Sequence, residues 1–132
     1  MAKFSKTSKD RLSTCHPLLQ KLFNKVILFY DCTIVQGYRG QEDQDKAFSK
    51  GKSKLKWPDS KHNSTPSMAV DVAPFINGQI CWEFVQMTHF AGFVLGLATE
   101  IGINIRWGGD WNRTNNLAQN KFNDLPHFEL KI

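Results

Sequence analysis

Apolar residues recur at the spacing of one helical face in two segments of the chain. The first segment covers residues 17–29 and begins at Pro17, which suits the first turn of a helix. The second covers residues 82–100 and is followed by Gly102, a residue type that often ends helices. These segments are predicted to form the two main helices, and residues 41–50 a short polar helix that stops before Gly51.

Short apolar or alternating segments predict strands between and after these helices. They cover residues 32–36, 68–74, 103–107 and 127–132. Residues 50–61 hold five lysines and are expected to form an exposed loop. The chain contains no repeat and no low-complexity linker. We therefore predict a single α+β domain over residues 1–132, with a small, mostly antiparallel sheet packed against two main helices and no appended binding module.

The composition is typical of a globular protein and argues against a membrane span. Of the 132 residues, 41% are apolar, and no run of about 18 apolar residues occurs. The basic N-terminus lacks the apolar core of a signal peptide, so a cytoplasmic protein is expected. The three scattered cysteines form no Cys-x-x-Cys pair, which favours free thiols. The net charge of +5 favours an anionic partner, either nucleic acid or a cell envelope.

The most informative single feature is Asp71, an aspartate inside an apolar segment that is expected to form a strand. Burying an ionised carboxylate is costly unless a cation or several donors compensate it. His62 lies nine residues before Asp71, and His127 follows Asp124 by three residues. A catalytic zinc site needs three nitrogen or oxygen ligands, an open position for water, and a further carboxylate to accept the proton of that water. These residues alone predict either a salt bridge or a metal at Asp71.

Several motifs, spaced over residues 15–130, resemble the D-alanyl-D-alanine carboxypeptidase/dipeptidase family of zinc peptidases. The resemblance is greatest to phage endolysins that act as L-alanyl-D-glutamate peptidases. The motifs are Gly37-Tyr38-Arg39 with Gln44, Ser60-Lys61-His62 with Ala69-Val70-Asp71, Arg106-Trp107-Gly108-Gly109-Asp110-Trp111, and Asp124-x-x-His127. The resemblance implies that His62, Asp71 and His127 bind Zn²⁺. It also implies that Asp124 is the catalytic base and that Arg39 polarises the scissile carbonyl and stabilises the oxyanion.

The chain departs from the pattern of this family at two places. Many members have seven residues from the first histidine to the aspartate, whereas the step from His62 to Asp71 is nine. The longer loop changes the rim of the expected pocket. Many members also carry a glutamate at the position of Gln36.

Two carboxylates near His127 compete for the role of base. In a regular strand Glu129 would share a face with His127 and Asp124 would not. Pro126 disfavours a regular strand before His127, so Asp124 is expected to turn toward the metal, and Glu129 to orient an imidazole. Further candidates for supporting or substrate-binding roles are Asp110, Trp107, Gln44 and Ser60. Asp110 could equally tie a glycine turn to backbone amides, and Trp107 could belong to the core.

The leading interpretation is a zinc-dependent peptidoglycan endopeptidase, an endolysin that hydrolyses the L-alanyl-D-glutamate bond of the stem peptide. Alternatives are a D,D-carboxypeptidase that removes terminal D-alanine and a catalytically inactive cell-wall-binding module. A nucleic-acid partner rests only on the charge and is not expected. A monomer is expected. The resemblance further implies that the protein accumulates in the host cytoplasm and reaches the wall through a separate membrane pore.

Overall fold

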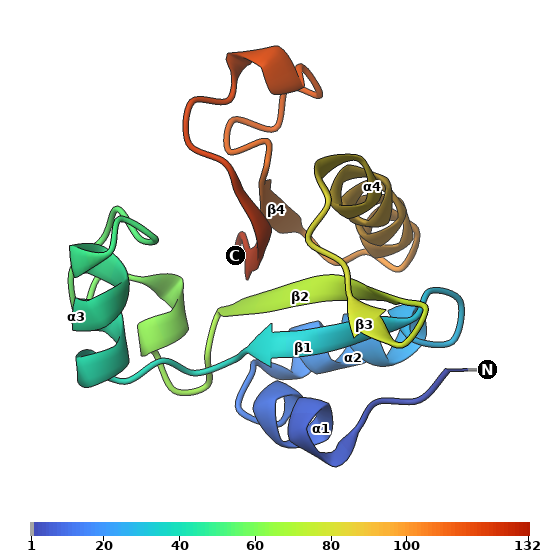
Figure 1. Ribbon diagram of the computed structural model, residues 1–132, viewed down its shortest axis with the longest axis horizontal. Coiled ribbons are helices and arrows are strands. Elements are labelled where there is room, and N and C mark those ends of the chain that lie inside the picture. Colours follow the sequence, from blue (N-terminus) through green and yellow to red (C-terminus); the bar gives the residue numbers. More distant parts are fainter. Residues whose placement is uncertain (1) are drawn as a thin grey trace.

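A five-stranded sheet runs through the centre of the molecule, and all its paired strands are antiparallel (Figure 1). The computed structural model describes residues 2–132. Along the sheet the order is β1-β2-β5-β4, and β3 pairs with the end of β2. The strands are β1 (Cys32–Gln36), β2 (Ala69–Ile76), β3 (Gln79–Ile80), β4 (Ile105–Gly108) and β5 (Asp124–Leu130). This arrangement confirms the predicted α+β fold with a small antiparallel sheet.

Four α-helices accompany the sheet in the described chain: α1 (Lys6–Leu12), α2 (Pro17–Val26), α3 (Gln41–Ser49) and α4 (Phe84–Glu100). Two short 3-10 helices, η1 (Lys61–Asn63) and η2 (Leu117–Gln119), lie in the loops. The sequence predicted α2, α3 and α4 to within a few residues but did not predict α1. None of the helices in the described chain has the length and apolar character needed to cross a bilayer.

One face of the sheet forms the hydrophobic core with α1, α2 and α4, whereas α3 stands apart (Figure 1). Strand alternation sends Val70 and Val72 of β2, and Phe128 and Leu130 of β5, into this core. The core residues from α2 and α4 are Leu19, Leu22, Phe23, Val26, Phe90, Ala91, Val94 and Ala98. The same alternation turns the side chains between these strand residues to the opposite face, where the polar groups gather.

The three cysteines are free thiols in very different surroundings. Burial raises the pKa of Cys15 to about 11 and that of Cys32 to about 12, whereas Cys81 is only half-buried.

Because the thiolate is the reactive form, we expect one fast-reacting thiol in the native protein at about pH 8 and three after denaturation. A coloured disulfide reagent measures this count. Cys81→Ser should abolish the fast reaction, and rapid labelling of two or more native thiols would contradict the prediction.

Candidate metal centre and active site

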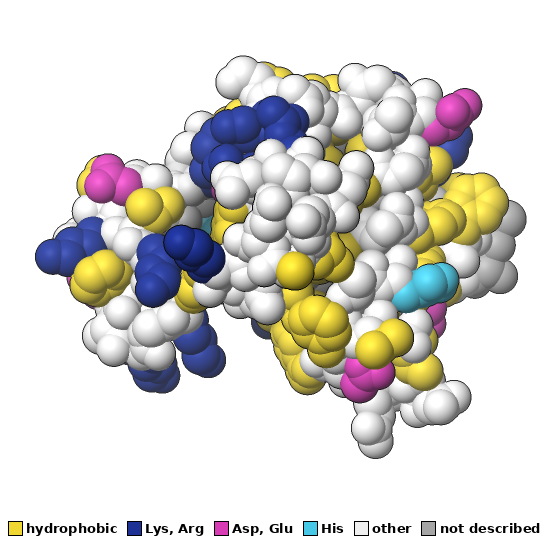
Figure 2. Space-filling model, turned by 90° about the horizontal axis from the view of Figure 1, so that it is seen from above, with side chains coloured by type: hydrophobic (Ala, Val, Ile, Leu, Met, Phe, Trp, Pro, Cys, Tyr) yellow, Lys and Arg dark blue, Asp and Glu magenta, His cyan; other side chains and the backbone are white. Residues whose placement is uncertain are grey.

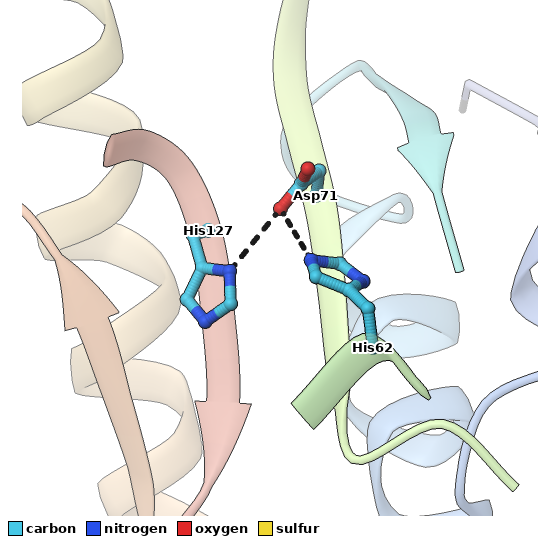
Figure 3. A group of neighbouring side chains, drawn as sticks. All are labelled: His62, Asp71 and His127. Atoms are coloured by element: carbon cyan, nitrogen blue, oxygen red, sulfur yellow. Dashed lines mark hydrogen bonds and ion pairs between the residues drawn. The ribbon is translucent and has the colours of Figure 1, made fainter. Parts of the chain in front are cut away.

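Three side chains from separate elements converge on the polar face of the sheet (Figure 3). Asp71 on β2 and His127 on β5 are direct cross-strand partners, so their side chains lie next to each other. His62 comes from η1, whose N-cap Ser60 accepts a hydrogen bond from the His62 backbone N–H. Asp71 Oδ1 lies 3.1 Å from His62 Nε2 and 3.4 Å from His127 Nδ1. All three residues are buried, and the candidate ligand atoms lie within 4.8 Å of one another.

Hydrogen bonds on the far side of each imidazole fix which nitrogen faces Asp71. His62 Nδ1 donates to the Gly37 carbonyl at 2.8 Å, because a carbonyl oxygen can only accept. His127 Nε2 donates to Glu129 Oε1 at 2.8 Å. The remaining nitrogens, His62 Nε2 and His127 Nδ1, face Asp71, and when deprotonated each can offer its lone pair to a metal ion. This is the arrangement that metal-binding histidines need.

The spacing and charges of this group fit a divalent metal. Burial alone would raise the pKa of Asp71, but the two imidazoles beside it hold that pKa well below its usual range. Burial opposes charge on His127 as well, yet hydrogen bonds to Asp71 and Glu129 raise its pKa to about 9. Tetrahedral ligands about 2.0 Å from a zinc ion lie about 3.3 Å apart, close to the two contacts of Asp71. The group can thus bind a metal in place of the imidazole protons.

Asp124 lies beside the group because β5 is irregular at its start. Gly108 pairs with Asp124 and Trp107 with Phe128, so residues 125–127 have no partner in β4. The bulge brings Asp124 Oδ2 to 3.8 Å from His127 Nδ1. Gly108 permits this approach, since a Cβ there would lie 2.1 Å from the Asp124 carbonyl oxygen. Burial and the charge of Asp71 raise the pKa of Asp124 to about 6, a value suited to exchanging protons near neutral pH.

Glu129 contacts Nε2 of His127, whereas Asp124 lies near the other ring nitrogen, Nδ1. Burial opposes the charge of Glu129, but contacts with His127 and Arg106 lower its pKa to about 2. Arg106 is its cross-strand partner on β4 and donates to Glu129 Oε2 at 2.8 Å. Both carboxylate oxygens are thus engaged. Sequence reasoning assigned no role to Arg106, although its alternation with Trp107 places it on the polar face of the sheet.

Arg39 contacts the group through Asp71, and a buried glutamine sets its direction. Arg39 Nη2 lies 3.5 Å from Asp71 Oδ2, and its Nη1 donates to Gln44 Oε1 at 3.1 Å. Arg39 Nε donates to Gln36 Oε1 at 3.4 Å. Gln36 is neutral, so it adds no negative charge beside Arg39, whose ion pair is with Asp71. Gln44 also accepts from Asn63 Nδ2, a residue that sequence reasoning missed.

Gln44 is fully buried and joins α3 to the loop that follows it. Its Nε2 donates to Ser53 Oγ at 3.0 Å and to the Leu55 carbonyl at 2.7 Å.

Replacing Gln44 by leucine would remove its hydrogen bonds to these groups and to Arg39. We therefore expect a loss of about 1–3 kcal/mol in the free energy of unfolding. Loss of activity should accompany it, because Arg39 loses its orientation. Urea unfolding measures the first effect, and Gln41→Leu, at an exposed position of α3, is the matched control. Equal stability of the two variants would contradict this role.

The remaining candidates from the sequence lie farther from the ligand group. Ser60 is buried and caps η1. Trp107 belongs to the core and donates from Nε1 to the Leu125 carbonyl at 2.6 Å, next to Asp124. Asp110 accepts from the backbone N–H groups of Thr114 and Asn115 and thereby ties its own loop. The structure does not bring Trp107 or Asp110 to the metal group.

Two clefts meet at the site. The larger has a volume of about 810 Å³ and runs from Asp71 and Asp124 toward α3. The smaller, of about 380 Å³, passes His62 and His127 and is walled in part by Trp111. Arg39, Phe122 and Asp124 line both clefts. An extended substrate can therefore pass the candidate metal group from one cleft to the other.

The phage L-alanyl-D-glutamate peptidase family matches this chain over residues 1–131. The chain belongs to that family. An L-alanyl-D-glutamate peptidase of Escherichia phage T5 is 38% identical to this chain over 113 residues, which cover 83% of this chain and 82% of that protein. This membership agrees with the resemblance found in the sequence motifs.

Two bacterial proteins are also similar to this chain. The peptidoglycan L-alanyl-D-glutamate endopeptidase CwlK of Bacillus subtilis is 28% identical over 113 residues, covering 76% of this chain and 60% of CwlK. The crystal structure of the Serratia marcescens L-Ala D-Glu endopeptidase ChiX matches with a TM-score of 0.77 and 26% identity. That match covers 98% of this chain and 90% of ChiX, so the whole described fold is shared.

Proposed function

We propose that this protein is a peptidoglycan endopeptidase that hydrolyses the bond between L-alanine and D-glutamate in the stem peptide. The family and the named relatives support this bond. The observation that carries the chemistry is the buried group of His62, Asp71 and His127 with Asp124 beside it. A metal-binding set of side chains next to a carboxylate of raised pKa is what metal-assisted hydrolysis requires.

Zn²⁺ is the metal we propose, held by His62 Nε2, His127 Nδ1 and a carboxylate oxygen of Asp71. Two imidazoles and one carboxylate form a common ligand set of catalytic zinc. When bound, zinc supplies positive charge that polarises a carbonyl and makes water more acidic. Glu129 and the Gly37 carbonyl keep the two imidazoles in the required tautomers.

In this proposal Asp124 accepts a proton from the attacking water and returns it to the leaving amine of D-glutamate. Its pKa of about 6 suits both steps, because the group can gain and lose a proton near neutral pH. Arg39 stabilises the negative charge that develops on the carbonyl oxygen. Its guanidinium is already aimed at the site by Gln44 and Gln36.

The proposal includes a monomeric enzyme that acts on the bacterial wall after release from the host cytoplasm through a separate membrane pore. Its test is mass spectrometry of fragments released from purified peptidoglycan by the zinc-loaded protein. New N-terminal D-glutamate is the expected product, and the Asp124→Ala variant should release none. Free D-alanine would identify a D,D-carboxypeptidase instead. Absence of fragments with zinc bound would favour a wall-binding module.

A further inference from the structure

We propose that Lys50 and Lys52, at the end of α3, bind the free carboxylate of the D-glutamate residue on the leaving side of the scissile bond. This inference rests on the proposed function and deepens it, because it names the group that fixes the direction of the substrate. A glutamate within a peptide uses one carboxyl in the chain and keeps the other free. The leaving side of the bond therefore carries a negative charge, whereas alanine contributes only a methyl group.

The larger cleft joins these two lysines to the catalytic group. Asp71, Asp124 and Arg39 line one part of it, and Lys46, Lys50 and Lys52 line another. Figure 2 shows Lys and Arg side chains gathered on the side of the molecule where Figure 1 places α3. A substrate whose scissile bond lies at Asp124 can extend along this cleft to the lysines.

The backbone that carries the two lysines is held in a fixed turn. Gly51 has a φ of +74°, a conformation that suits glycine, and ends α3 between them. The Gly51 N–H donates to the Phe48 carbonyl at 3.1 Å, and the Lys52 N–H donates to the Ala47 carbonyl at 2.9 Å. This pair of bonds is the Schellman motif of helix ends. Lys50 and Lys52 thus flank one ordered glycine instead of lying on a free loop.

Their charges are available for a ligand. Lys46 lies 3.5 Å from Glu42, but neither Lys50 nor Lys52 lies within 4.0 Å of a carboxylate in the described part of the chain. Asp43 is the remaining carboxylate of this cleft besides Asp71 and Asp124. Asp71 is already paired with two imidazoles and Arg39. The α3 end of the cleft therefore offers unpaired positive charge.

The smaller cleft offers less free positive charge to a carboxylate, because its cations already contact other groups of the protein. Arg106 pairs with Glu129 at 2.8 Å, Lys61 donates to the Leu130 carbonyl at 3.3 Å, and Lys54 lies over the Phe122 ring. Leu55 and Trp111 add apolar surface to this cleft. An alanine methyl fits these walls better than a carboxylate does. The contrast between the clefts places the glutamate side toward Lys50 and Lys52.

The test compares two synthetic peptides that contain the L-alanyl-D-glutamate bond and differ only in one group. In one peptide the second carboxyl of D-glutamate is free, and in the other it is a carboxamide. We expect the zinc-loaded wild-type protein to prefer the free carboxylate. Lys50→Gln/Lys52→Gln should lower kcat/KM about 5- to 10-fold for the carboxylate and less than about 2-fold for the carboxamide, as two solvent-exposed ion pairs allow.

The matched control is Lys9→Gln/Lys25→Gln, which makes the same change in net charge on α1 and α2 and should alter neither rate. The preference should also weaken as salt rises from about 50 mM to about 300 mM, because exposed charges are screened. Equal losses on both peptides, or no loss on either, would overturn the inference while leaving the proposed function intact. If the wild-type protein cleaved neither peptide, the proposed function would fall and the inference with it.

Discussion

Replacement of Asp124 by asparagine is expected to lower kcat about 10²- to 10⁴-fold while the protein still binds its metal. Asparagine keeps the size of the side chain but cannot accept a proton at neutral pH. Asp124 lies 3.8 Å from His127 Nδ1, outside the close contacts that join Asp71 to the two imidazoles. Its loss should therefore remove proton transfer and leave the ligand set in place.

The rate of cleavage of a soluble L-alanyl-D-glutamate peptide measures the loss of kcat. Mass spectrometry of the metal content measures whether the variant still binds its metal. Glu129→Gln separates the two carboxylates that compete for the role of base. One oxygen of Glu129 accepts from His127 and the other from Arg106. The Glu129→Gln variant should therefore have a metal affinity about 10- to 100-fold weaker and should recover activity in excess zinc. Asp10→Asn, on α1, controls for the change in charge. Full activity of Asp124→Asn would show that another group serves as base.

Local alternation explains why the strands that carry the ligands could be predicted. Asp71 stands between Val70 and Val72, and both valines lie in the core, so the aspartate must face the opposite side. His127 has the same relation to Phe128 on β5. The apolar neighbours of each ligand are read directly from the sequence. The cross-strand pairing of Asp71 with His127 then brings the two ligands together.

Elements without a periodic apolar signal could not be predicted in the same way. Helix α1 begins at Lys6 and is capped by Ser5, whose Oγ accepts from the Ser8 N–H, and it buries only Ser8 and Leu12. One buried apolar residue in a seven-residue helix leaves no stripe. Its boundaries are set by the cap and by contact with β1, where the Ile34 N–H donates to Ser8 Oγ. A contact of that kind depends on the folded chain.

The residues that support the site could be predicted from the sequence only in part, for a related reason. Pro126 suggested an irregular strand, but the position of Asp124 also depends on the absence of a Cβ at Gly108. Gln44 is a polar residue in a polar helix, and nothing in that pattern indicates that it is fully buried. Its partners come from three separate segments. Such networks are fixed by tertiary packing and carry no periodicity along the chain.

Zinc is expected to raise the melting temperature of the metal-free protein by about 12–20 °C when its free concentration is about 1,000 times the dissociation constant. Ligand that binds only the folded state at this ratio stabilises it by about 4 kcal/mol, and each kcal/mol shifts a domain of this size by about 3–5 °C. The shift requires all three ligands. His127→Ala should therefore lose it, together with the restoration of activity by zinc after chelation.

The zinc-dependent shift is the informative quantity, because His127→Ala also changes the metal-free protein. In that state His127 is paired with Asp71 and Glu129, and its removal leaves two buried carboxylates with one partner fewer. His89→Ala is the matched control, since His89 is exposed on α4 and should keep the full shift. Mg²⁺ should produce little shift in any variant, because it prefers oxygen ligands to imidazole. A zinc shift of equal size in wild type and His127→Ala would place the metal elsewhere and remove His127 from the ligand set.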